Sequence, residues 1–322
     1  MYIYIHIHIH TYTRRSASAA RGRGANKAKS WCKLEARCDG VQRVSKARAL
    51  PGLHDGSDKE KRNGANPPAP PLTIMSVSFK TVVIPESSQH EIALASVVVA
   101  RNLSVAADTT NPEFTRSKKY RLDGFSIVRP LTGAAAQASG GSGLPMNFKR
   151  TARSQAKNLS VVGSERELLS LLVARLHNVD PDVLIGHNIQ NFQLSTLMHR
   201  LQHHKITHWS KIGRARLTRA PRAGAKGSFF GRLCPGRLVC DTYTQARDLT
   251  RESTYTLQHL VRLFVKKNLV KIDPVDVPRY WGNARDLLYA VSHSENDAYA
   301  TLQLMQEMEM LPLSLQLTRL GG

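Results

Sequence analysis

The chain has 322 residues, of which 41% are hydrophobic and 6% aromatic, and 46 lysines and arginines against 24 aspartates and glutamates give a formal net charge of +22. This length allows about two domains or one large domain, and the apolar content excludes a chain that is disordered throughout. The longest apolar stretch, residues 93–100, is far shorter than the ~20 residues of a membrane span. The charge therefore predicts a polyanionic partner, nucleic acid rather than a membrane. Four cysteines and the lack of a secretory pattern favour an intracellular protein.

The first 29 residues are expected to lack a fold. Residues 1–13 alternate in a way that is typical of a strand, on which His6, His8 and His10 would share one face and could chelate a metal. Tyrosine, isoleucine, histidine and threonine are also the residues that a TA/CA repeat encodes, and we interpret the tract as translated low-complexity sequence. Residues 14–29 are rich in Ala, Gly, Ser and Arg, which predicts disorder.

An ordered domain is predicted to begin after the prolines of residues 67–71, which mark a boundary. Residues 72–81 and 90–100 are predicted to pair as a strand hairpin, and residues 124–129 could form a third strand. Residues 131–160 contain alanine and glycine runs, so a flexible insertion is expected there.

Helices and short strands alternate in the second half of the chain. Ser164 with Glu167 forms a capping box, which predicts a helix to about residue 178. Further helices are expected at residues 192–202, 255–266 and 283–311, and strands at 182–187 and 236–241. A hairpin followed by this alternation predicts one α/β domain with a mixed sheet over residues 67–311.

The charge is concentrated between Val183 and Cys240, where there is no acidic residue. Residues 205–235 are expected to form a basic loop that contacts a phosphate backbone, although a solvated loop that only keeps the protein soluble is the alternative. Trp209 could stack on a base or anchor the loop to the core. The candidate nucleic-acid contacts are Lys205, Lys211, Arg214, Arg216, Arg219, Arg222 and Lys226.

Residues 180–192 (DPDVLIGHNIQNF) resemble the second exonuclease motif of B-family DNA polymerases. Residues 208–214 (HWSKIGR) and 236–241 (GRLVCD) are more specific and resemble the branch of that family that initiates replication. The resemblance extends roughly over residues 30–322. It implies an RNase H-like, 3′–5′ exonuclease-like fold for residues 67–311, a remnant of the polymerase N-terminal domain and linker at 30–66, and a return to that domain at 312–322.

The resemblance also defines the positions at which a proofreading site would lie. The family exonuclease uses two divalent metals held by an Asp-x-Glu on the first strand, an Asp after the second motif and a Tyr-x3-Asp near the end. The corresponding residues in this chain are Ser78, Lys80, Gln193, His293 and Asp297. One carboxylate cannot hold two dications, so no metal and no intact catalytic site are expected in this chain, and proofreading is expected to be absent.

The family's palm motifs are absent, so this chain is expected to be a truncated polymerase that is inactive alone, with Mg²⁺ needed only by the full-length DNA-directed DNA polymerase. The resemblance implies a nuclear location, with DNA or a primer–template, the remaining polymerase domains and the primase and accessory subunits as partners. Two alternatives remain. A divergent RNase H-like nuclease would use Asp241, Glu295 and Asp297, and a stand-alone basic module would only bind nucleic acid.

Isolated histidines and cysteines are given structural roles. His187 follows a predicted buried strand and is interpreted as a core histidine. Cys32 with Cys38, and Cys234 with Cys240, lack the spacing of a zinc site, so these thiols are expected to be ordinary buried or loop residues.

Overall fold

The computed structural model describes residues 30–32, 71–84, 89–103, 121–138, 143–154, 158–220 and 233–320. The alternating tract of residues 1–13, the alanine- and arginine-rich segment that follows it, Cys38 and the rest of 33–66 lie outside the described residues. Arg222 and Lys226 of the expected basic loop also lie outside them.

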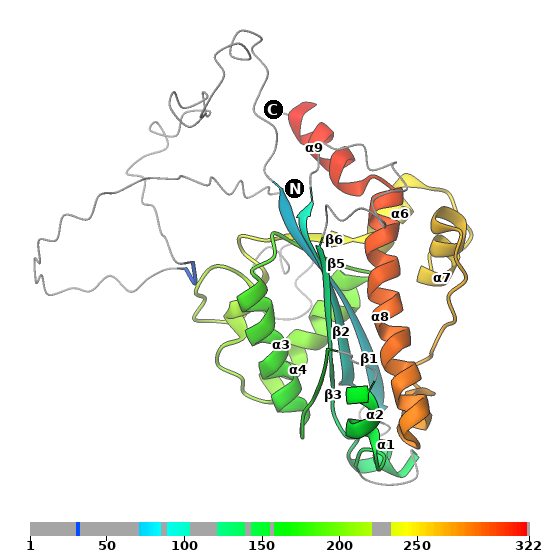
Figure 1. Ribbon diagram of the computed structural model, residues 1–322. Helices are drawn as coiled ribbons and strands as arrows, with labels where there is room; N and C mark the ends of the chain where they lie inside the picture. The colour runs from blue at the N-terminus through cyan, green and yellow to red at the C-terminus, as the bar shows by residue number, and fades with distance from the viewer. Residues whose placement is uncertain are drawn as a thin grey trace, which may run out of the picture.

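A six-stranded mixed sheet forms the centre of the domain (Figure 1), in the order β4-β3-β2-β1-β5-β6. The strands are β1 (Leu72–Ile84), β2 (Gln89–Leu103), β3 (Arg121–Val128), β4 (Leu159–Val161), β5 (Val183–Gly186) and β6 (Leu238–Asp241). The first three strands are antiparallel, whereas β5 runs parallel to β1, β6 to β5, and β4 to β3. The predicted α/β class, mixed sheet and first hairpin are confirmed.

The hairpin of β1 and β2 contains an irregularity at Lys80. Lys80 pairs with Leu94 and Thr81 with Ile92, so Ala93 of β2 has no partner in the register. A bulge of this kind increases the local twist and redirects neighbouring side chains, and such bulges are frequent beside functional sites. The bulge therefore lies at one of the positions that the family resemblance marks.

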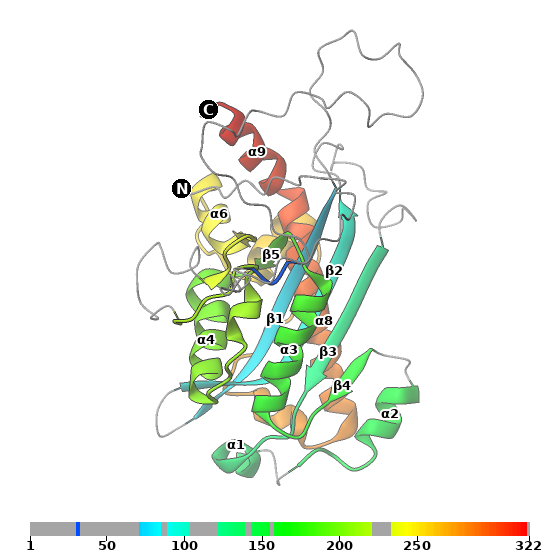
Figure 2. The same cartoon turned by 90° about the vertical axis from the view of Figure 1, so that its left-hand side faces the viewer.

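Helices cover both faces of the sheet, as Figures 1 and 2 show. On one face lie α3 (Glu165–Val179) and α4 (Leu194–His203), whose apolar residues form one core with β1, β2 and β3. The predicted capping box is present, since the Ser164 side chain accepts a hydrogen bond from the Glu167 N–H. A π-helical turn, η4 (Ile189–Gln193), precedes α4, so this helical segment begins earlier than the sequence predicted.

The long helix α8 (Ala284–Glu307) crosses the other face of the sheet (Figure 1). Around it lie α6 (Thr242–Leu249), α7 (Leu257–Leu260), η6 (Val261–Val265), η7 (Val277–Trp281) and α9 (Met310–Leu320). The predicted helix at 283–311 is divided at Glu309, which has a positive φ of 48°. Among the described helices, none is both long and apolar enough to cross a membrane.

The predicted flexible insertion at residues 131–160 contains regular secondary structure in the parts that the structure describes. Those parts form α1 (Gly133–Ala138), α2 (Phe148–Ser154) and the edge strand β4, near one end of the sheet (Figure 2). Leu131 and Phe148 are each 1% exposed and pack in a core cluster with Val291 of α8. These two apolar side chains join the described parts of the segment to the core.

Candidate functional site

The degenerate exonuclease positions on β1 face the helix α8. Ser78 and Lys80 are two residues apart, so their side chains leave the same face of the strand. The Lys80 Nζ lies 2.6 Å from the Asp297 Oδ2. Both residues are buried, at 8% and 6% exposure. The alternative that Lys80 points to solvent from a strand edge is therefore excluded.

Asp297 is held as an anion inside the domain. Burial raises the pKa of its carboxyl group, but the neighbouring His293 imidazole and the Lys80 ammonium lower the pKa below its usual value. The His293 Nδ1 lies 3.4 Å from the Asp297 Oδ2, and the His293 Nε2 lies 2.6 Å from the Val270 carbonyl oxygen. The residue that would be a metal ligand in an active exonuclease is thus engaged by two side chains of this protein.

Ser78, at the position of the first expected aspartate, belongs to a seam of hydroxyl groups between β1 and α8. Its Oγ lies 3.4 Å from the Ser294 Oγ. The Ser76 Oγ donates to the Ala298 carbonyl at 2.7 Å. These groups are almost completely buried and satisfy one another, so the strand and helix approach closely without carboxylates at this position.

Gln193, at the position of the third expected carboxylate, ends η4 next to the end of β5. Its Nε2 lies 3.5 Å from the His187 carbonyl oxygen. A Cβ atom on Gly186 would lie only 2.5 Å from the Gln193 Oε1 and 2.8 Å from the Ile189 Cβ, so Gly186 is needed for this close approach. None of the described hydrogen bonds joins Gln193 to the pair of Lys80 and Asp297.

His187 is half-buried at the end of β5 and its ring has a structural contact. Burial lowers its pKa to about 4, and the nearby charge of Asp297 only partly opposes this shift. The His187 Nδ1 lies 3.0 Å from the Thr242 Oγ1. The ring is therefore neutral at physiological pH and joins β5 to the start of α6.

The carboxylates of the predicted alternative nuclease are engaged separately. Asp241 is 2% exposed and accepts hydrogen bonds from the backbone N–H groups of Asn188, Gln190 and Tyr243. Glu295 accepts a hydrogen bond from the Ser126 Oγ at 2.8 Å. Asp297 is paired with Lys80, as described above. In the described ranges no group of three or more metal-ligating side chains comes together.

Arg214 of the predicted basic loop is buried rather than available to a phosphate. It is 8% exposed, its Nε lies 2.9 Å from the Asp180 Oδ1, and its Nη2 lies 2.9 Å from the Asp182 Oδ1. Although burial raises the pKa of Asp180, Arg214 and Arg237 lower it below its usual value. Arg214 joins the loop to the end of α3 and the start of β5, and its guanidinium is engaged by the Asp180 and Asp182 carboxylates inside the protein.

Two other predicted nucleic-acid contacts, Lys211 and Arg216, lie against Trp31 of the described N-terminal segment, residues 30–32. The guanidinium of Arg216 lies 4.3 Å from the centre of the Trp31 ring, and the Lys211 Nζ lies 5.1 Å from it. The backbone N–H of Trp31 also donates to the Arg214 carbonyl oxygen at 2.7 Å. Arg216 is nevertheless exposed, as are Lys205 and Arg219, whereas Trp209 is 8% exposed and anchors the loop to the core.

The sequence analysis missed a buried ionic cluster that joins β2 and β3 to α3 and α4. The Arg129 Nη2 lies 2.7 Å from the Glu91 Oε2, and the Arg200 Nε lies 3.0 Å from both carboxylate oxygens of Glu165. His204 lies 2.8 Å from the same carboxylate. Arg200 interrupts the apolar pattern of its helix, and this was the available signal. The cluster fixes helices on the sheet and has no evident catalytic role.

Two of the cysteines are buried and unreactive. Burial raises the pKa of Cys234 and that of Cys240 to about 12, so both are protonated thiols at physiological pH. Both thiols are unpaired.

The comparisons with known proteins agree with this architecture. The family model described as "DNA polymerase family B, exonuclease domain" matches residues 12–260. The chain therefore belongs to the B-family DNA polymerases, and its sheet and helices form an exonuclease-like domain. Its relatives include DNA polymerase alpha catalytic subunits: that of Oryza sativa subsp. japonica is 31% identical over 309 residues, with 92% of this chain and 19% of the relative covered. The Arabidopsis thaliana subunit is 32% identical over 267 residues, with 79% of this chain and 17% of the relative covered.

The subunit of Mus musculus is 31% identical over 254 residues, with 79% of this chain and 16% of the relative covered. The chain thus spans less than a fifth of the length of these relatives.

Proposed function

We propose that this chain is the inactivated exonuclease-like domain of a replicative DNA polymerase alpha catalytic subunit. It has no proofreading activity and serves as a structural brace beside the DNA. Residues 67–311 form the domain, residues 30–66 are a remnant of the polymerase N-terminal domain and linker, residues 312–322 begin the return to that domain, and residues 1–29 are a translated low-complexity tract. The complete polymerase would work in the nucleus with Mg²⁺, a primer–template and the primase and accessory subunits.

The ion pair of Lys80 and Asp297 is the observation that carries this proposal. In an active exonuclease, carboxylates at these positions bind two divalent metals that activate water and stabilise the leaving oxygen. Here Lys80 places an ammonium 2.6 Å from Asp297, and Ser78 and Gln193 add no negative charge. A dication would have to displace a buried cation to reach the one remaining carboxylate, so the residues present do not fit a two-metal site.

A degradation assay tests this absence of proofreading. The chain is incubated with a 5′-labelled primer that carries a 3′ mismatch, in Mg²⁺ or Mn²⁺, with a proofreading B-family polymerase as the positive control. The primer should keep its length. Because a contaminating nuclease could shorten the primer, Asp297→Asn is assayed in parallel. Shortening by the parent chain that disappears in Asp297→Asn would refute the proposal.

Contact with the DNA backbone is proposed for the exposed cations of the basic segment, Lys205, Arg216 and Arg219, with Lys211 beside them. Each phosphate that a protein neutralises steepens the fall of log K with log salt by about 0.9 for duplex DNA. Replacing the three exposed cations by alanine should therefore reduce the slope by up to about 2.7. An equal reduction in the control Arg262→Ala, Lys266→Ala and Lys267→Ala would contradict a specific role for this segment.

A further inference from the structure

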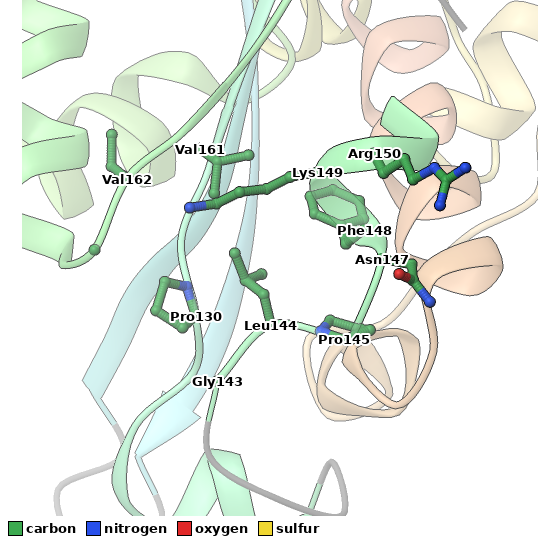
Figure 3. A pocket seen from close by; sticks show the side chains of 11 residues that line it. Pro130, Gly143, Leu144, Pro145, Asn147, Phe148, Lys149, Arg150, Val161 and Val162 are labelled. Carbon is green, nitrogen blue, oxygen red and sulfur yellow. The ribbon is translucent and has the colours of Figure 1, made fainter. Parts of the chain in front are cut away.

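A hollow opens between the short helix α2 and the edge strand β4, as Figure 3 shows. It has a volume of about 580 Å³ and is open on one side to solvent. Its lining is mostly apolar and includes Leu144, Phe148 and Val161, which belong to or pack against the core cluster below α8. No part of the proposed DNA-adjacent segment lines this hollow.

Among the described residues, no strand pairs with the outer edge of β4. β4 is the last strand in the sheet order and pairs with β3. The Asn158 carbonyl accepts from the Ser126 N–H, and the Val162 N–H donates to the Val128 carbonyl. Main-chain groups alternate in direction along a strand, so those of Leu159 and Val161 point away from β3. Such an edge is a template for another strand.

Positive charge borders the hollow. Lys149 extends across it toward Val161, and Arg150 follows on the same helix with its side chain directed away from Val161 (Figure 3). Both residues are exposed, and none of the ion pairs formed within the described residues involves either of them. None of the described residues that line the hollow is acidic. A ligand that combines carboxylates with apolar groups would therefore complement this surface.

We propose that β4 and the hollow bind an extended peptide segment of a partner protein. The segment would add to β4 as a further strand, place an apolar side chain against Leu144 and Val161, and place a carboxylate beside Lys149. Addition of a strand supplies affinity through main-chain hydrogen bonds and specificity through the pocket for a side chain. The apolar floor and the free strand edge favour a peptide over a nucleic acid, which would need neither.

The test uses the full 322-residue chain and a fluorescein-labelled octapeptide made of valine and glutamate, with fluorescence anisotropy as the measurement. Binding should saturate, and the double variant Lys149→Glu and Arg150→Glu should weaken it at least tenfold. Lys266→Glu and Lys267→Glu is the matched control, since it makes the same change in net charge directly after η6. This part of the chain follows α7, which lies far from α2 (Figure 1). This control should change the affinity by less than twofold.

Two further measurements separate strand addition from general charge attraction. Hydrogen exchange should show that the peptide protects the amides of Leu159 and Val161. A second octapeptide with lysine in place of glutamate should not bind. The proposal fails if the probe does not saturate, if both double variants weaken it equally, if those amides stay unprotected, or if a single-stranded oligonucleotide of equal charge displaces the peptide with the same dependence on Lys149. The last result would make nucleic acid the ligand of the hollow.

Discussion

The buried pair of Lys80 and Asp297 allows a quantitative prediction about the stability of this domain. The change is Lys80→Met, which keeps a side chain of similar length and removes the ammonium that lies 2.6 Å from the Asp297 carboxylate. Asp297 is 6% exposed, and its Oδ1 has no hydrogen-bond partner within the described residues, so the carboxylate would lose its closest cation in a place that water hardly reaches.

The expected cost follows from the energetics of buried ion pairs. Removal of one partner of such a pair typically costs about 3–5 kcal/mol, because the other charge remains buried and uncompensated. His293 still lies 3.4 Å from the Asp297 Oδ2, which moderates the loss. We therefore expect the free energy of unfolding to fall by about 3 kcal/mol at pH 7. Urea denaturation followed by circular dichroism measures this change.

A double variant tests whether the unpaired charge of Asp297 causes the loss of stability. Adding Asp297→Leu to Lys80→Met removes both charges, and replacing a buried pair by apolar residues is often close to neutral. The double variant should therefore regain at least half of the stability lost by Lys80→Met alone. The double-mutant cycle isolates the interaction between the two side chains. A loss below about 1 kcal/mol for the single variant, well under the usual range for a buried pair, or no recovery in the double variant, would refute the pairing.

The pH dependence gives an independent check of the same cause. In the parent chain the pKa of Asp297 lies below its unfolded value, so its stabilising effect is present above that value, about 3.9, and is lost as the pH falls through the folded pKa. In Lys80→Met, burial is expected to raise the folded pKa above the unfolded value. The penalty is then largest at neutral pH and shrinks in acid. A difference in stability that stays constant between pH 7 and pH 4 would contradict this explanation.

Three further predictions concern the surroundings of the site and the basic segment. Gly186→Ala should destabilise the domain by about 1–3 kcal/mol, because its Cβ would lie 2.5 Å from the Gln193 Oε1; an unchanged urea midpoint would contradict the close packing. Arg214→Met should lower the melting temperature because it breaks the ion pairs with Asp180 and Asp182. It should leave the salt dependence of DNA binding unchanged. A reduced slope of log K against log salt would instead indicate that Arg214 contacts DNA. His187 should titrate near pH 4 in an NMR experiment. Because its folded pKa lies below the unfolded value, the free energy of unfolding should fall as the pH drops below about 6.5. A titration near pH 6.5 would contradict the burial of the ring.

Much of the fold could be predicted from local sequence patterns. The hairpin strands, the capping box at Ser164 and the apolar stripe of α4 depend on residues that are close in sequence, and all three are present. The boundaries were less accurate, since the π-helical turns η4 and η6 alter the ends of two predicted helices. Composition did not predict the short helices within residues 131–160, where Leu131 and Phe148 pack into a core that the local sequence does not reveal.

For the candidate site, the sequence predicted the residue types but not the contacts that these residues make. The residue types at its positions could be assigned from the sequence through the family motifs, and those types alone already predict that two metals could not be held. The sequence left open whether Lys80 points to solvent or inward, and it offered Arg214 as a free cation. Both outcomes depend on what packs against these side chains from distant parts of the chain.

The sequence by itself thus determined the class of fold, the family and the loss of the expected carboxylates, because these are properties of residue type and short-range spacing. Tertiary structure decided what replaced them. Lys80 and Asp297 are 217 positions apart, and α8 brings them together inside the domain. Burial then makes their pairing strong, since a charge removed from water needs a partner. For the same reason the buried Arg214 is paired with Asp180 and Asp182. Lys205, Arg216 and Arg219 stay at the surface, where water solvates their charges.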